Sequence, residues 1–179
     1  MRLRARVFWD ILNPQSLFQC EDPRASGFLM TTTSQGYSSS SVQVTIEQLR
    51  YWVPTISDVA RVAEDSEGDG WKLSLEPRVA AACPVAITLH DTGRFDLVIG
   101  GETYVDRALD RLDQIVQFLE RVTDGNVIQR HWVSAATGVP RGIQTIVKLG
   151  PGVVWRDGME PDGGFEHHDR HFLPYRRRP

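Results

Sequence analysis

Hydrophobic and polar positions follow a regular pattern from Thr45 onward. Apolar residues recur every three or four positions from Ile46 to Ala63, which is the spacing of one helix face. Thr45 and Gln48 have the spacing of a capping box, so we expect the helix to begin at Thr45. Pro54 lies inside the pattern. Because proline has no amide donor, we expect it to kink this helix or split it into two pieces.

The pattern then changes to alternation, which predicts strands. Trp71, Leu73 and Leu75 alternate with polar residues, as do two later runs, 85–89 and 95–99. The polar segment between those two runs includes Gly93, a residue that tolerates positive φ in a tight turn. We therefore predict one strand followed by a hairpin.

The most regular pattern is an apolar stripe at helical spacing from Val105 to Val122. Charged and amide side chains occupy the opposite face, and Gly125 is placed to end the helix. A second hairpin is predicted from 127–133 and 143–147, with a short further strand at 153–155. The order of elements, α-β-β-β-α-β-β(-β), predicts an α+β fold. It would have one antiparallel sheet of about five to six strands, with both helices on one face.

The same patterns divide the chain into three parts. Residues 45–156 are expected to form a single α+β domain. Residues 1–44 are expected to be disordered, or to belong in part to an over-extended gene prediction, because residues 31–42 are almost all polar and directly follow Met30. Translation would then start at Met30. Residues 157–179 are rich in glycine, proline, histidine and arginine and are expected to form an extended tail.

Composition narrows the range of partners and compartments. The 179 residues carry a formal net charge of -3, which disfavours nucleic acid as a partner. No apolar run approaches the ~20 residues of a membrane-spanning helix, so we expect no membrane partner. Two cysteines in different contexts suggest no disulfide framework. Lysine occurs only at Lys72 and Lys148, and we interpret this arginine bias as codon usage of a bacterial, GC-rich genome. These observations favour a reduced cytoplasm.

One histidine-rich segment, 166–171, is a candidate metal site. Imidazole and carboxylate are common ligands of zinc and related ions. His167, Asp169 and His171 would share one face of a strand, and the two histidines would also share one face of a helix. The alternative is a solvated or partly docked tail with no ligand role. A divalent metal is therefore a possible cofactor, although none is predicted by default.

A second candidate is a ligand site on the open face of the sheet, lined by His90, His131 and Trp132. His131 and Trp132 are consecutive in one predicted strand, so one of them must face outward or an interface. No nucleophile elbow or phosphate-binding loop is present in the sequence. We therefore expect a non-catalytic module that binds another protein or a second copy of itself, such as a homodimer. The alternatives are a metal-dependent enzyme or metal-binding protein using the histidine-rich segment, and a small-ligand binder.

Overall fold

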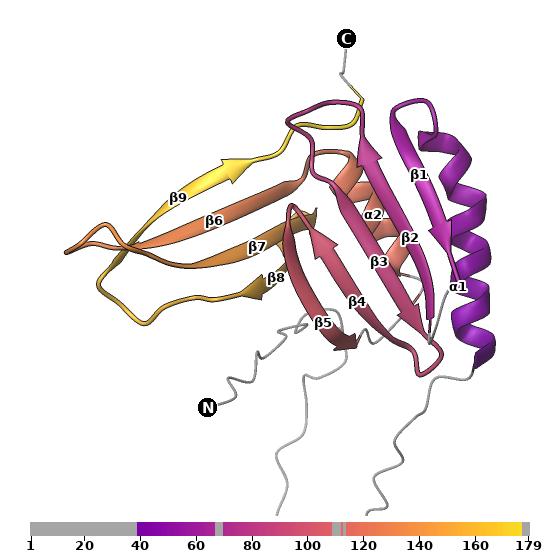
Figure 1. Cartoon of the computed structure of the whole chain (residues 1–179), viewed down its shortest axis with the longest axis horizontal. Coiled ribbons are helices and arrows are strands. Elements are labelled where there is room, and N and C mark those ends of the chain that lie inside the picture. Colours follow the sequence, from indigo (N-terminus) through magenta and orange to yellow (C-terminus); the bar gives the residue numbers. More distant parts are fainter. Residues whose placement is uncertain (1–38, 67–69, 109–111, 113, 177–179) are drawn as a thin grey trace, which may run out of the picture.

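The structure, a computed structural model, describes residues 39–66, 70–108, 112 and 114–176. These residues form two antiparallel sheets and two α-helices (Figure 1). The first sheet has five strands in sequential order: β1 (Ala60–Asp65), β2 (Gly70–Pro77), β3 (Val85–His90), β4 (Arg94–Ile99) and β5 (Glu102–Ala108). The second has four strands in the order β8 (Val153–Gly158), β7 (Pro140–Gly150), β6 (Val127–Ser134) and β9 (Phe165–His171). The helices are α1 (Ser39–Trp52) and α2 (Gln114–Thr123).

The α+β class, the antiparallel pairing and the presence of two helices are confirmed. The number and grouping of the strands differ from the prediction, because the strands divide into a five-stranded and a four-stranded sheet. Residues 60–63 and 105–108, which were predicted to be helical, lie instead in β1 and β5, the strands at the two edges of the first sheet. The periodicity of a short segment cannot reveal that a neighbouring strand supplies its hydrogen-bond partners.

Helix α1 begins at Ser39, before the boundary expected at Thr45. The Thr45 hydroxyl donates to the carbonyl oxygen of Ser41 at 3.0 Å, so Thr45 lies inside the helix and the capping-box prediction is wrong. The expected break at Pro54 is confirmed, because α1 ends at Trp52 and a short 3-10 helix, Val53–Ile56, contains the proline. The expectations for residues 1–38, including a start at Met30, lie outside the described residues.

The predicted helix from Val105 to Val122 is correct only in its second part. After Ile99 the chain turns through Gly100 and Gly101, both with positive φ, and residues 102–108 return as β5 beside β4. Helix α2 then begins at Gln114. Its predicted end is confirmed: Gly125 has a φ of 78°, and its amide donates to the carbonyl of Val122.

One core connects both helices with the first sheet and the inner end of the second. Strands β2, β3 and β4 each bury alternate residues toward this core, and α1 and α2 bury one face each against the same cluster. Val127, Val147 and Trp155 bring the second sheet into it. The Trp155 ring packs edge-on against Tyr104 at 5.6 Å and against Phe118 at 5.3 Å.

A bulge in β5 fixes how the first sheet meets the second. The register passes from Leu97 opposite Tyr104 to Phe95 opposite Arg107, so β5 has one residue more than β4 between these pairs. Asp106 has a φ of 56° there, and its amide donates to the carboxylate of Asp96 at 2.7 Å. The extra residue shifts the alternation of side chains. Tyr104 and Arg107 therefore lie on the same face of β5.

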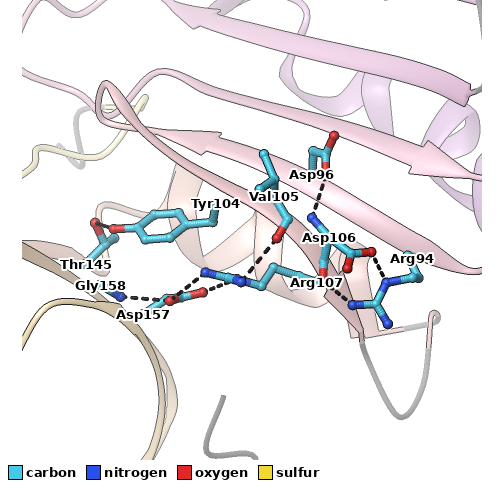
Figure 2. Close-up of polar contacts among 9 residues, drawn as sticks. All are labelled: Arg94, Asp96, Tyr104, Val105, Asp106, Arg107, Thr145, Asp157 and Gly158. Carbon is cyan, nitrogen blue, oxygen red and sulfur yellow. Dashed lines mark hydrogen bonds and ion pairs between the residues drawn. The ribbon is translucent and has the colours of Figure 1, made fainter. Parts of the chain in front are cut away.

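The side chains of Tyr104 and Arg107 both reach the second sheet, as Figure 2 shows. The Tyr104 hydroxyl bonds the Thr145 hydroxyl of β7 at 2.7 Å, and Arg107 forms an ion pair with Asp157 of β8. From the second sheet, the side-chain amide of Gln129 donates to the carbonyl of Gly100 at 3.1 Å. The two sheets are thus joined by polar contacts as well as by the shared core.

The segment expected to be an extended tail includes a strand. Residues 165–171 form β9, which pairs along its whole length with β6. Beyond it, Phe172 and Tyr175 are buried, and the Tyr175 hydroxyl donates to the carbonyl of Cys83 at 2.6 Å. Among the described residues, no helix has both the length and the apolar character needed to cross a membrane.

Candidate functional site on the second sheet

The second sheet extends beyond the core that supports its inner end. Figure 1 shows β6, β7 and β9 reaching away from the first sheet. Burial follows this geometry: Val127, Ile128 and Gln129 at the start of β6 are buried, whereas 130–134 are only partly covered. In β9 every residue from Glu166 to His171 is exposed. We call residues 130–134, 140–143 and 165–169 the outer half of the second sheet.

An ion pair links the two strands at the base of this outer half. Arg130 of β6 and Asp169 of β9 are directly opposite each other in the ladder. The guanidinium donates two hydrogen bonds to the two carboxylate oxygens, at 2.8 and 2.9 Å. Hydrogen bonding to Asp169 raises the pKa of Arg130, and the same hydrogen bonding lowers the pKa of Asp169. The pair is therefore charged at neutral pH and holds both side chains in one geometry.

Aromatic side chains continue the same face outward. Trp132 is opposite His167, and their rings meet edge to face with centroids 5.0 Å apart. The Arg130 guanidinium lies over the Trp132 ring at 5.7 Å. The indole Nε1 of Trp132 is buried and has no hydrogen-bond partner among the described residues. We call Arg130, Trp132, His167 and Asp169 the arginine–tryptophan face.

The neighbouring strand β7 is partly covered on this side by the segment that follows β8. Gln144 donates from its side-chain amide to the Glu160 carboxylate at 3.0 Å. A Cβ atom at Gly142 would lie 2.7 Å from the Met159 Sδ and 2.8 Å from its Cβ, so glycine is what allows this close approach. On its β7 side, the arginine–tryptophan face is therefore bounded by Met159 and Glu160.

The three residues predicted to line a small-ligand site do not come together in one sheet. His90 ends β3 in the first sheet, where its Nε2 lies 3.1 Å from a carboxylate oxygen of Asp96. His131 and Trp132 are in β6 of the second sheet. Trp132 belongs to the arginine–tryptophan face, whereas His131 lies opposite His168 on the other face. The structure thus assigns these residues to three separate surroundings.

The predicted metal ligands share one face of β9, as expected for alternate residues of a strand. The Asp169 carboxylate, however, is occupied by Arg130, and the Nε2 of His167 lies 3.9 Å from it. Within the described residues, no group of three or more histidine, cysteine, aspartate or glutamate side chains is arranged to hold a metal ion. Metal binding by His167, Asp169 and His171 stays a prediction. Elemental analysis of protein purified without a histidine tag would test it.

Sequence reasoning found Trp132 and the histidines but missed Arg130 as their neighbour. Arg130 precedes Trp132 by two residues, which places both on one face of a strand. That spacing was available in the sequence. The pairing of β6 with β9, which brings Asp169 to Arg130, joins residues that are far apart in the chain and left no local signal.

Comparisons of the chain with protein-family models, with curated proteins and with solved structures found no match.

Proposed function

We propose that this chain is a non-catalytic module that binds protein through the outer half of its second sheet. The observation that carries the proposal is the burial gradient along β6 and β9. The inner end of the sheet is packed into the core, and the outer half presents organised side chains to solvent. Sheet surface beyond the core adds little to folding, so its order is better explained by a binding role.

The composition of the arginine–tryptophan face supports this role. Tryptophan and arginine are enriched among the residues that contribute most binding free energy at protein interfaces. Here both are already ordered, because Arg130 is held by Asp169 and packs over Trp132. Side chains that are fixed before binding lose less conformational entropy when a partner docks.

The compartment belongs to the proposal as well. We propose that the protein acts in a bacterial cytoplasm. The low cysteine content supports this, since the chain has two cysteines and the described one, Cys83, is a buried free thiol.

Site-specific photo-crosslinking in the native cells tests the proposal. A photo-reactive phenylalanine analogue would replace Phe165 or His168 of β9, one residue per variant. The matched control would carry the same group in place of Tyr51, which lies on α1 and is 87% exposed. We expect discrete protein adducts from the β9 positions and none from the control.

The mass of each adduct identifies the partner as a second copy or as another protein. Adducts that form equally at Tyr51, or that fail to form at both β9 positions, would contradict the proposal.

A further inference from the structure

Strand β9 is an edge that is open to further pairing. Among the described residues, β9 has one neighbour in the sheet, β6, so no described strand pairs with the backbone groups on its other side. In Figure 1 it forms the outer border of the second sheet. Exposed edges of this kind accept another strand, and proteins usually protect them with charged side chains. The charges on β9 therefore decide which strand could pair there.

The sequence of β9, FEHHDRH, is complementary to itself in the antiparallel direction. When the strand is paired with its own copy about His168, Glu166 meets Arg170 and Asp169 meets His167. Both acidic residues of the strand thus face basic ones. His168, the midpoint of the Phe165–His171 strand, faces itself, so the pairing uses the full length of β9.

Other symmetric registers lose this complementarity. Centring the pair on Asp169 places two aspartates opposite each other, and centring it on His167 places Asp169 opposite Phe165. Like charges in directly opposite positions destabilise a strand pair. Registers centred between two consecutive residues are excluded by symmetry. They would pair odd residues with even ones, whereas a two-fold axis perpendicular to the sheet keeps odd residues on the same face in both copies.

We propose that the protein forms a homodimer in which β9 pairs antiparallel with β9 of a second copy, centred on His168. This inference rests on the proposed function and names the partner. The two four-stranded sheets become one continuous sheet. The arginine–tryptophan faces of both copies lie on the same side of it, and the two cores lie at opposite ends of the paired strands.

A charge-exchange experiment on the full chain tests the register. Glu166→Arg places arginine opposite Arg170 of the other copy, and Arg170→Glu places glutamate opposite Glu166. Each substitution turns two symmetry-related attractions into repulsions, so the dimer dissociation constant should rise about tenfold or more. Mixing the two variants should restore dimers, because each Arg-bearing strand then meets a Glu-bearing one. Analytical ultracentrifugation measures both effects.

Arg170 also packs over the Phe172 ring at 4.6 Å, so Arg170→Glu alone could disturb the fold. If the mixture of the two variants dimerises, Arg170→Glu must be folded, since a misfolded chain would not form dimers with Glu166→Arg. A monomeric wild-type chain, or a mixture that dimerises no better than either variant, would overturn the proposal.

Disulfide trapping provides a second, independent measurement. In a Cys20→Ser background, His168→Cys should crosslink two copies under mild oxidation, because residue 168 faces itself. Arg170→Cys should not, because it faces residue 166. Preferential crosslinking at 170 would refute the register.

The outcomes separate the two proposals. Photo-adducts of β9 with a different protein, together with a monomeric chain in solution, would leave the proposed function intact and eliminate the homodimer. No adduct at all would remove the proposed function.

Discussion

Arg107 of β5 and Asp157 of β8 form an ion pair with two hydrogen bonds, which links the first sheet to the second (Figure 2). The pair is well shielded from water, with 18% of the arginine side chain and 3% of the aspartate side chain exposed. The carboxylate also accepts a hydrogen bond from the Gly158 amide at 2.8 Å. This contact exists because the bulge at Asp106 places Arg107 on the face that meets β8.

Removing Arg107 should destabilise the protein strongly. Arg107→Ala leaves the Asp157 carboxylate buried without its counter-charge, which costs about 3 kcal/mol. We expect the free energy of unfolding in urea to fall by that order, whereas Arg61→Ala at an exposed position should leave it nearly unchanged. The double variant Arg107→Met/Asp157→Leu should lose less than Arg107→Ala, because no charge is left buried. An Arg107→Ala protein as stable as the Arg61 control would show that the pair does not hold the sheets together.

Arg130 should control the ionisation of Asp169. The pKa of Asp169 is lowered mainly by its hydrogen bonds with Arg130. Arg130→Gln removes the positive charge and the two-bonded geometry, so the pKa of Asp169 should rise toward its ordinary value. NMR titration of the side-chain carboxyl carbon measures this. Arg156→Gln, an exposed change on β8, is the control and should leave the titration of Asp169 unchanged.

The fold should lose stability in alkaline solution. Burial raises the pKa of the Cys83 thiol from 9.0 to about 12 and that of the Tyr104 hydroxyl from 10.0 to about 12. At a pH between the ordinary pKa of each group and its raised value, the unfolded chain releases a proton that the folded chain keeps. The free energy of unfolding therefore decreases as pH rises. Their contribution is fully present below pH 9 and is lost as the pH approaches about 12.

Urea denaturation across this range measures the slope. Cys83→Ala/Tyr104→Phe should show a shallower decline than the wild type. Equal slopes would mean that these two groups do not differ between the folded and unfolded states. Burial also raises the pKa of Tyr175, which should account for part of the decline that remains in the double variant.

Gly158 should tolerate no side chain. Its φ is 107°, and a Cβ atom there would lie 2.3 Å from the carbonyl oxygen of Ile143 on β7. Gly158→Ala should therefore cost more than the ~1 kcal/mol expected from an unfavourable φ alone. Gly152→Ala is a matched control, since it has a φ of 73° and open space around the new methyl group. In thermal unfolding, the melting temperature of Gly158→Ala should be clearly lower than that of Gly152→Ala. Equal melting temperatures would contradict the close approach.

Several features followed from local patterns and were confirmed. The alternation in 85–89 and 95–99 predicted the β3–β4 hairpin, and Gly93 has the positive φ that its turn requires. The α-helix breaks next to Pro54, and α2 ends at Gly125, as expected. These features depend on hydrogen bonds and conformational preferences within a few residues, which is why a sequence pattern reveals them.

The tertiary structure decided the rest. The strand at 102–108, the division into two sheets and the pairing of β6 with β9 all depend on partners far along the chain. The sequence alone identified Trp132 and the histidines as candidates. The spacing of Arg130 and Trp132 was also present in the sequence, but only the folded chain showed that Asp169 pairs with Arg130 and that His90 lies in a different sheet. The physical reason is that strand pairing satisfies backbone groups between distant segments, and no local periodicity encodes which distant segment will supply them.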